Sequence, residues 1–432
     1  MFDSTKLAST KTKKLPLSPS QLTLAKKLGV YVHIPYCLQR CTYCDFATFV
    51  ESETIPQANY FAILIQEIQA RSRVFPKQKL DTLYFGGGTP SLAPAKELEK
   101  VLDSLSRNGF EFDCHTEVSL EINPATLNKS KLKDLKSLGF NRFSVGAQSF
   151  NDELLKSVGR IHSSQETLQT LKLLEEENYS FDLLFALPGQ SFRDLQRDLD
   201  ILGSVRPPHV SPYLLTVKDQ HPLATHRLEE EIQIAFFDQI HDALESWGYN
   251  IYEISNASRD SLHSRHNMLY WTQENIWGLG LSAHSHHRNL GEFGTRFWNA
   301  SSMSTYRSSV EVLGSSGECS SKDLGVALGA SEFLCSWEFL TDLFHTRLRL
   351  GEGIEVQEFS KLDFLTDPMR LKLISKLRSL VAKSWLEEFC NSQGRQAFRL
   401  TRAGKHLSNQ VFLEFTFSEG DLRECDIGRV YP

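Results

Sequence analysis

The feature that most constrains the fold is an alternation of short β-type runs with longer helical stretches between residues 30 and 215. The predicted strands are 30–34, 82–85, 117–122, 142–145, 181–185 and 210–215. The predicted helices between them are 60–71, 94–106, 127–138, 164–176 and 192–202. Such alternation indicates a parallel sheet with right-handed crossovers. Six units suit a partial (β/α)6 barrel or an open doubly wound sheet, and periodicity alone does not separate the two.

The rest of the chain divides around this region. Residues 1–28 contain six Lys and one Asp and are expected to form a flexible basic tail. The barrel is assigned to 29–228 and an extension, with a stretch rich in His, Asn, Trp and Gly, to 229–320. Residues 321–432 are predicted to form a smaller C-terminal, mainly helical domain. Its helices and short β-hairpin are compatible with a winged-helix module.

Composition excludes several classes of protein. The hydrophobic content of 41% and the charged content of 23% are ordinary for a globular chain. A net charge of −6 predicts no nucleic-acid partner. Because no apolar run reaches the ~18–20 residues needed to cross a bilayer, no transmembrane segment is predicted, and peripheral membrane contact stays open. Of eight cysteines, five are scattered without a disulfide pattern, which fits a reducing cytoplasm.

The other three cysteines lie together directly after the first predicted strand, as Cys37-x3-Cys41-x2-Cys44. Three thiolates on one tight loop can bind three irons of a 4Fe–4S cluster and leave the fourth iron without a protein ligand. A closed zinc site would need a fourth close Cys or His. His33 is nearby, but strand alternation and a proline lie between it and the loop. The spacing therefore predicts a cluster with one open iron.

Small or polar residues also follow the next strands. The run Gly-Gly-Gly-Thr-Pro at 86–90 follows the second strand, Glu121 ends the third, Gln148 follows the fourth and Asp182 lies in the fifth. The glycine run is not a P-loop, because G-x4-G-K-[ST] is absent, but it can let a ligand approach the backbone. Since the carboxyl ends of parallel strands meet at one edge, we expect one shared site for an amino-acid-like ligand on the open iron.

Taken together, these motifs resemble the radical S-adenosylmethionine superfamily. The resemblance rests on the cysteine loop, with Tyr43 before its third cysteine, and on Gly-Gly-Gly-Thr-Pro. Longer strings are similar to the coproporphyrinogen dehydrogenase-like branch, over about residues 29–415. These are Tyr-x-His-Ile-Pro-Tyr-Cys, Glu-Ile-Asn-Pro, Gly-x-Gln-Ser-Phe, Gly-Arg-Ile-His and Asp-Leu-x-x-x-Leu-Pro-Gly-Gln.

The resemblance implies a radical S-adenosylmethionine barrel in which Cys37, Cys41 and Cys44 bind the 4Fe–4S cluster. The residues that it places on S-adenosylmethionine are Tyr31, Tyr43, Gly87, Gly88, Thr89, Glu121, Gln148, Arg160 and Asp182. A carboxylate such as Asp182 or Glu121 suits a ribose diol or an amino group, and a guanidinium suits a carboxylate. Without the cysteine loop, Gln148 would be taken for a turn residue and Arg160 for half of a surface ion pair.

Two subfamilies of this branch compete. The oxygen-independent coproporphyrinogen III oxidase has a further cysteine two residues after the third cluster ligand, whereas Asp45 and Phe46 follow Cys44 here. The HemW subfamily of heme chaperones has Cys-Asp-Phe at this place and a His-Asn-x-x-Tyr-Trp motif, which matches residues 266–271. The resemblance therefore implies heme as a third cofactor and a heme chaperone as the function, with the oxidase as the alternative.

The same resemblance implies tentative heme contacts at His266, Tyr270 and Trp271. An imidazole can bind heme iron, and the two aromatic rings offer flat apolar faces. The competing interpretation is a core histidine packed among aromatic rings. The implied partners are acceptor hemoproteins, as in respiratory chains, and an electron donor such as flavodoxin or ferredoxin.

A second histidine-rich segment follows at Gly280-Leu-Ser-Ala-His-Ser-His-His287. HemW proteins usually show Gly-Ala-His-Gly there, and this chain has Ser282 and Ser285 in place of the two glycines, which puts the loop geometry in question. His286 and His287 are candidate metal ligands, with solvated surface histidines as the alternative.

Overall fold

The computed structural model describes residues 25–315 and 329–423. Its main feature is a twelve-stranded sheet with the strand order β14-β13-β12-β11-β1-β4-β5-β6-β7-β8-β10-β9. Seven neighbouring strands in this sheet are parallel. They are β11 (Asn275–Leu279), β1 (Leu28–Ile34), β4 (Thr82–Gly87), β5 (Glu117–Ile122), β6 (Arg142–Gln148), β7 (Tyr179–Phe185) and β8 (His209–Leu214). The six predicted strands are all present.

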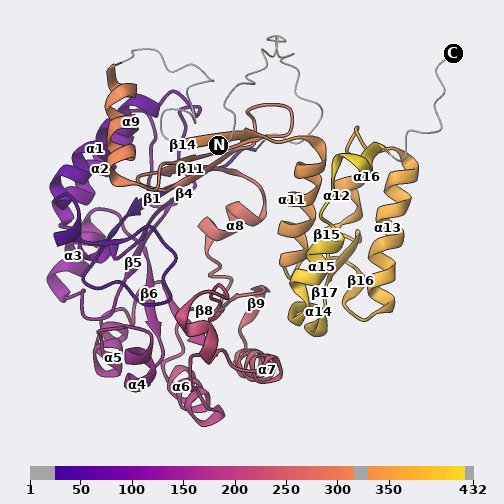
Figure 1. Cartoon of the computed structure of the whole chain (residues 1–432), viewed down its shortest axis with the longest axis horizontal. Helices are drawn as coiled ribbons and strands as arrows, with labels where there is room; N and C mark the ends of the chain where they lie inside the picture. Colours follow the sequence, from indigo (N-terminus) through magenta and orange to yellow (C-terminus); the bar gives the residue numbers. More distant parts are fainter. Residues whose placement is uncertain (1–24, 316–328, 424–432) are drawn as a thin grey trace, which may run out of the picture.

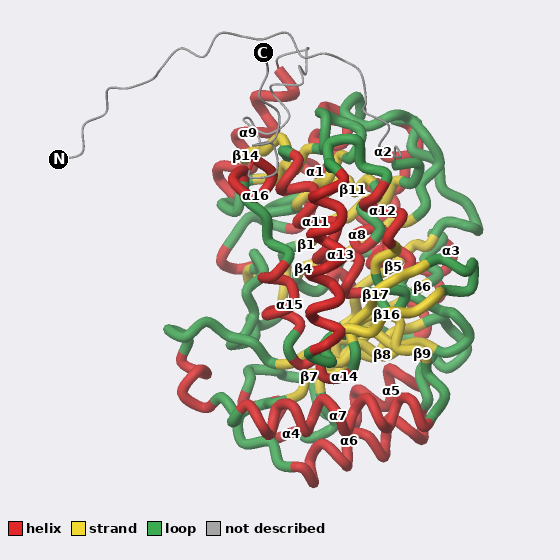
Figure 2. The backbone as a smooth tube through the Cα atoms, turned by 90° about the vertical axis from the view of Figure 1, so that its right-hand side faces the viewer, coloured by secondary structure: helices red, strands yellow, loops and turns green. Residues whose placement is uncertain are grey.

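Helices cover the outer face of the parallel strands, as Figures 1 and 2 show. They are α1 (Gln57–Arg71), α2 (Ala95–Arg107), α3 (Lys129–Ser137), α4 (Asp152–Ser157), α5 (Ser164–Leu173), α6 (Phe192–Val205) and α7 (Glu230–Ser246). Helices α5 and α6 begin at capping boxes on Ser163 and Ser191, where each hydroxyl accepts a hydrogen bond from the third backbone amide of the helix. Strands that alternate with such helices are buried on both faces. The predicted partial (β/α)6 barrel is thereby confirmed.

Antiparallel strands flank the barrel at both edges. At one edge β12 (His284–His287), β13 (Thr295–Asn299) and β14 (Gly329–Phe333) extend the sheet, and at the other β10 (Asn256–Ser258) and β9 (Asn250–Glu253) do so. Among the described residues β9 and β14 do not pair, so the barrel is open. The sheet thus continues past residue 320, where the sequence analysis ends the barrel extension. Helix α9 (Met303–Ser315) packs against α1.

The C-terminal part is a compact unit of helices around a three-stranded sheet (Figure 1). In chain order it contains α11 (Ser336–Arg349), β15 (Ile354–Glu355), α12 (Val356–Ser360), α13 (Asp367–Ala382), β16 (Leu386–Cys390) and β17 (Gln396–Leu400). Helices α14 (Arg402–His406), α15 (Ser408–Glu414) and α16 (Glu419–Arg423) follow. The order helix, strand, two helices and hairpin is that of a winged helix, as the sequence suggested. Its buried apolar residues form a cluster separate from that of the barrel.

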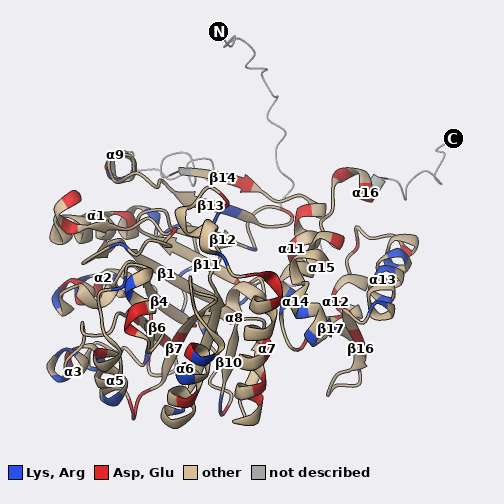
Figure 3. Ribbon diagram, turned by 60° about the horizontal axis from the view of Figure 1, so that its bottom comes forward, with Lys and Arg blue, Asp and Glu red and all other residues tan. Residues whose placement is uncertain are grey.

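Charged residues join the two parts. On α14, Arg402 lies within 3.0 Å of carboxylates of Asp242 and Glu245 on α7, where Figure 3 shows acidic residues along the helix. Arg349 of α11 lies 2.6 Å from the buried Glu253 of β9. Elsewhere on the outer helices of Figure 3, basic and acidic residues are interspersed.

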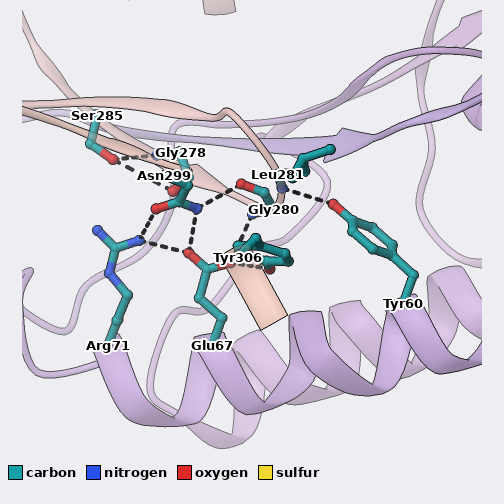
Figure 4. Close-up of polar contacts among 9 residues, drawn as sticks. All are labelled: Tyr60, Glu67, Arg71, Gly278, Gly280, Leu281, Ser285, Asn299 and Tyr306. Atoms are coloured by element: carbon teal, nitrogen blue, oxygen red, sulfur yellow. Dashed lines mark hydrogen bonds and ion pairs between the residues drawn. The ribbon is translucent and has the colours of Figure 1, made fainter. Parts of the chain in front are cut away.

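A buried carboxylate fixes one edge of the barrel (Figure 4). Glu67 of α1 is fully buried and accepts hydrogen bonds from Arg71 at 2.6 Å, Asn299 at 2.8 Å, Tyr306 at 2.6 Å and the Gly280 amide at 2.8 Å. A buried charge is tolerated when it is paired and its acceptor positions are filled. This one carboxylate therefore ties α1, α9, β13 and the end of β11 together.

Candidate cofactor site

The three cysteines of the loop lie at the carboxyl end of the barrel. Cys37 ends the short strand β2 (Tyr36–Cys37), which pairs with β3 (Phe49–Val50), and Cys41 and Cys44 share a turn. All three are free, partly exposed thiols that line one cavity of about 500 Å³. Within the described residues, no three His, Cys, Asp or Glu groups converge closely enough to hold a single metal ion. Thiols spread in this way suit a cluster of several irons better than one zinc ion.

The nearest imidazole does not add a fourth ligand. His33 is buried, with Nδ1 at 3.0 Å from the Tyr31 hydroxyl and Nε2 at 3.0 Å from the Ala47 carbonyl oxygen. Both ring nitrogens are therefore occupied. Within residues 25–315 and 329–423, three thiols without a fourth protein ligand fit the predicted open iron.

Hydrogen bonds to residues that follow α4 and β4 hold the cysteine loop. The Thr42 amide donates to the Val158 carbonyl at 3.1 Å, and Gln39 donates to the Gly159 carbonyl at 3.2 Å. The Thr89 hydroxyl lies 3.7 Å from Cys37 Sγ, and Arg160 Nη1 lies 3.6 Å from Cys41 Sγ. The hydrogen bond from Thr89 favours the thiolate form of Cys37, the form that binds iron. Burial opposes this effect and raises the pKa of the thiol.

The glycine run has a packing role as well as the predicted role of admitting a ligand. Gly87 has φ of +114°, and a Cβ there would lie 2.6 Å from the His33 ring. A Cβ on Gly88 would lie 2.6 Å from the Tyr36 carbonyl oxygen. The amides of Gly88 and Thr89 instead donate to the carbonyls of Ile34 and Tyr36. The absent side chains thus let the end of β4 pack directly against the strand that leads into the cysteine loop.

Two carboxylates line the cavity, Glu121 near the end of β5 and Asp182 in the middle of β7. Glu121 accepts hydrogen bonds from the Tyr84 hydroxyl and the Gly87 amide, each at 2.9 Å, and burial raises its pKa to about 7. Asp182 accepts from the hydroxyls of Ser144 at 3.1 Å and Ser180 at 3.3 Å, and burial raises its pKa to about 6. Such groups gain from pairing with a cationic or hydroxylated ligand, which restores the stabilisation that burial removes.

A chain of polar contacts links the guanidinium group to the cluster loop. Arg160 donates to Asn123 Oδ1 at 2.9 Å and to the Gly146 carbonyl, and Asn123 Nδ2 donates to Thr89 Oγ1 at 2.8 Å. Sequence reasoning did not select Asn123 or Tyr84. Asn123 stands directly after β5 and next to Glu121, so its place at a strand end was the available signal.

The cavity brings together most of the predicted cofactor residues. Those that line it are Cys37, Cys41, Tyr43, Cys44, Gly87, Gly88, Thr89, Glu121, Gln148, Arg160 and Asp182. Gln148 has φ of +69° at the irregular end of β6 and lines the cavity, where its predicted contact with S-adenosylmethionine stays a prediction. Tyr31 does not line the cavity. Its ring stacks on Tyr84 at 6.1 Å.

The three predicted heme residues lie on α8 (Arg265–Trp271), and none of them lines the cavity. His266 is 2% exposed, with Nδ1 2.7 Å from the Thr82 hydroxyl and its ring stacked on Tyr84 at 5.0 Å. Burial lowers its pKa to about 3. Tyr270 packs edge-on against His266, and Trp271 lies beneath the Arg349 guanidinium at 4.5 Å. Ligation of heme by His266 therefore stays a prediction, and it requires α8 to move.

The second histidine segment packs within the sheet. His284 stacks on Trp298, His287 stacks on Phe75 at 4.6 Å, and His286 Nδ1 lies 3.3 Å from the Glu274 carbonyl oxygen. In the described part of the chain these histidines form no metal-binding group. His287 is buried in the core and His286 is half-buried, whereas His284 is exposed on the surface of the sheet extension.

The two serines of that segment adopt different roles. Ser282 has φ of +56°, a left-handed conformation that favours glycine. Ser285 is buried, and its hydroxyl accepts a hydrogen bond from the Gly278 amide at 2.9 Å. Of the two serines that stand in place of glycines, only Ser282 has a backbone conformation that disfavours a side chain.

Known proteins and family models similar to this chain point to the same cofactors as the site. The family model described as the Radical SAM superfamily matches residues 31–202. The heme chaperone HemW of Lactococcus lactis is 34% identical over 284 residues, which are 62% of this chain and 73% of that protein. HemW of Bacillus subtilis is 28% identical and the match covers 90% of this chain and 98% of the relative. The zebrafish mitochondrial protein "Radical S-adenosyl methionine domain-containing protein 1" is 35% identical over 63% of each chain.

A solved structure gives the same fold. The coproporphyrinogen III oxidase HemN of Escherichia coli, titled a radical SAM enzyme, superimposes with a TM-score of 0.74 and 20% identity over 91% of this chain and 90% of that one. None of the helices in the described ranges is long and apolar enough to cross a membrane. Because HemW proteins more than 30% identical are matched over more than two thirds of their length, the chain belongs to the heme chaperone HemW family of the radical SAM superfamily.

Proposed function

We propose that this chain is a heme chaperone, which binds heme and delivers it to acceptor hemoproteins such as those of respiratory chains. One observation carries the proposal: three thiols with no fourth protein ligand open onto a carboxylate-lined cavity in a member of the HemW family. Cys37, Cys41 and Cys44 would hold a 4Fe–4S cluster, and the cavity would hold S-adenosylmethionine.

The cavity residues suit that cofactor. A reduced 4Fe–4S cluster supplies the electron that can cleave S-adenosylmethionine. Glu121 and Asp182 would accept hydrogen bonds from amino or ribose hydroxyl groups, which suits their enclosed, hydrogen-bonded carboxylates. Arg160, 3.6 Å from Cys41 Sγ, would bind the cofactor carboxylate beside the open iron. Tyr43, Gly87, Gly88, Thr89 and Gln148 complete the expected contacts.

The alternative is oxygen-independent coproporphyrinogen III oxidase, which decarboxylates propionate side chains. Its solved relative is similar at 20% identity, which supports the shared fold alone. Phe46, in the place of the additional cysteine of the oxidase, is 64% exposed at the edge of the cavity. Family membership and this residue favour the chaperone.

One anaerobic experiment separates the two functions. The reconstituted protein is titrated with heme by absorbance and then mixed with an apo-hemoprotein, and a parallel sample receives coproporphyrinogen III, S-adenosylmethionine and a reductant. The expected result is saturable heme binding followed by transfer, without formation of protoporphyrinogen. Protoporphyrinogen formation coupled to consumption of S-adenosylmethionine would establish the oxidase instead.

We also propose a reducing compartment such as the cytoplasm and an electron donor of the flavodoxin or ferredoxin type. Partly exposed, free cluster thiols support the first, since they need a reducing environment to stay available for iron. The electron donor is supported by the chemistry of the cluster, which needs an electron before it can cleave S-adenosylmethionine. Cell fractionation tests the location, and cluster reduction by each purified donor, followed by electron paramagnetic resonance, tests the partner.

A further inference from the structure

Large apolar side chains are exposed around the opening of the cofactor cavity. Phe46 is 64% exposed, and Tyr213 and Leu214 are each 40% exposed, while all three line the cavity. We call these three residues the cavity mouth. Leu38 and Ile161, also exposed, line an adjoining hollow of about 220 Å³ that shares Cys41 and Arg160 with the main cavity. Five of the thirteen exposed large hydrophobic residues in the described part of the chain thus surround the cysteine loop.

The mouth joins two segments that are distant in the sequence. Phe46 belongs to the cysteine loop, and Tyr213 and Leu214 end β8. The segment after β8 returns to the loop, where His221 Nε2 donates to the Thr42 carbonyl at 2.8 Å. Since Leu223 N donates to Nδ1 of the same ring, both imidazole nitrogens are used and the contact has a fixed direction. This contact ties the segment after β8 to the cysteine loop that carries Phe46.

The cofactors expected in the cavity do not account for the mouth. The residues suited to S-adenosylmethionine are polar and lie at the strand ends, whereas Phe46 and Leu214 offer only hydrocarbon surface. Gathered exposed apolar residues mark a binding surface more often than scattered ones do. On the same loop as Phe46, the exposed Arg40 donates to the Cys44 carbonyl at 3.0 Å, and no carboxylate among the described residues pairs with its guanidinium. The cysteine loop thus carries both an exposed aromatic ring of the mouth and an exposed guanidinium that has no ion-pair partner among the described residues.

We propose that the cavity mouth of Phe46, Tyr213 and Leu214 is the surface that holds heme, with a propionate of the porphyrin on Arg40. The proposal rests on the proposed function, which supplies heme as the ligand. A porphyrin is a flat apolar plate that carries two carboxylates at one edge, and aromatic and aliphatic side chains with an adjacent guanidinium match it. His266 is enclosed by Thr82 and Tyr84, whereas the mouth residues are exposed, so heme can reach them without a movement of α8.

Heme titrations of matched surface variants test the apolar contact. Phe46→Ser and Leu214→Ser are compared with Leu371→Ser and Leu413→Ser, which remove leucines that are 67% and 70% exposed on the C-terminal unit. Cluster content and thermal unfolding are measured for every variant, so that loss of the cluster or of folding is not counted as loss of the heme surface. The mouth variants should bind heme about tenfold more weakly, because a buried apolar side chain contributes on that scale. The two control variants should bind as the wild type does.

A second comparison tests the cation. Arg40→Gln should weaken heme binding about threefold, the size of a solvent-exposed ion pair. It should leave the binding of heme dimethyl ester, which has no free carboxylate, unchanged. An equal loss for heme and for the ester would overturn the assignment of the propionate to Arg40.

The outcomes separate this inference from the function on which it rests. Heme bound by the wild type and equally well by both mouth variants would overturn the inference and leave the chaperone function standing. Wild-type protein that binds no heme would overturn both. Mouth variants that bind heme normally but are reduced or unloaded more slowly by a partner protein would show a protein-docking surface and would also overturn the inference.

Discussion

The cysteine loop and helix α8 both carry motifs that point to iron chemistry, but their surroundings differ. The three thiols are partly exposed on a cavity, and the loop is held by neighbours such as Val158 and Gly159 through its backbone and through Gln39. On α8, His266 is enclosed, its imidazole is hydrogen-bonded to Thr82, and its amide donates to the buried Glu117 at 2.9 Å. The first region keeps its thiols accessible from the cavity, whereas the second buries its imidazole in packing contacts.

The difference shows that a short motif does not by itself distinguish a ligand from a structural support. A ligand must keep an unused donor or acceptor at an accessible surface, and the loop does so three times. In α8 the Nε2 atom of His266 has no partner in the described residues, but it is buried. The neighbouring Asn267, rather than the histidine, lines the cavity. The variants below test this contrast, beginning with the largest expected effect.

Replacing a cluster ligand should abolish function at the open region. Cys41→Ala is expected to eliminate the iron–sulfur absorbance and, with it, the binding of S-adenosylmethionine, because two thiols cannot hold the cluster with one open iron. Absorbance and calorimetric titration of the reconstituted protein measure both. Cys390→Ala, at an exposed thiol on β16, is the matched control and should change neither. Binding of S-adenosylmethionine by Cys41→Ala at wild-type strength would contradict the open-iron site.

Replacing the buried histidine should mainly destabilise the fold. His266→Ala removes a stacked ring and a hydrogen bond, and we expect the free energy of unfolding to fall by about 2–4 kcal/mol. Chemical denaturation measures the change, and Thr82→Val, which removes only the hydrogen bond, should cost about 1 kcal/mol. If His266 also binds heme after α8 moves, Thr82→Val should strengthen heme binding, since it favours the open position. A His266→Ala protein as stable as the wild type would contradict the structural role of His266 and, with it, the difference drawn between α8 and the cysteine loop.

The buried carboxylates should make cofactor binding depend on pH. S-Adenosylmethionine is cationic at its sulfonium and amine, so it binds the ionised form of Glu121 better. Because burial raises the pKa of Glu121 to about 7, affinity should rise about tenfold between pH 6 and pH 8. The pKa of Asp182, raised to about 6, adds a rise in the same direction at lower pH. Stability should change in the opposite sense, since the neutral form is favoured in the fold and is lost as pH rises from the unfolded pKa to about 7.

Calorimetric titration at several pH values checks this dependence. Glu121→Gln should flatten the rise between pH 6 and pH 8. Glu97→Gln replaces a carboxylate in a surface ion pair on α2 and is the control, which should leave the dependence unchanged. An unaltered slope in Glu121→Gln would show that another group governs binding.

The sequence predicted the barrel and the cavity well because both follow from local patterns. Strand alternation set the six units, and the strand ends placed Glu121, Gln148 and Asp182 together with the cysteine loop. Contacts that depend on the tertiary arrangement were not predictable. Glu67 and its four donors come from four separate elements, and apart from the i,i+4 pair of Glu67 and Arg71 no sequence spacing connects them (Figure 4). The burial of His266 under β4 likewise depends on where α8 packs, which its motif does not specify.

The two serines in place of glycines give the smallest predicted effects, with opposite signs. Ser282→Gly should stabilise the protein by about 0.5 kcal/mol, because relief of the left-handed strain at φ of +56° exceeds the entropy that glycine adds to the unfolded chain. Ser285→Gly should destabilise it by about 1 kcal/mol or more, because it leaves the buried Gly278 amide without its acceptor. Denaturation midpoints of the two variants, with the double variant as a check of additivity, measure both. Two destabilising results would show that the Ser282 side chain makes a contact that outweighs its backbone strain, and that the loop at the end of β11 has adapted to the serine.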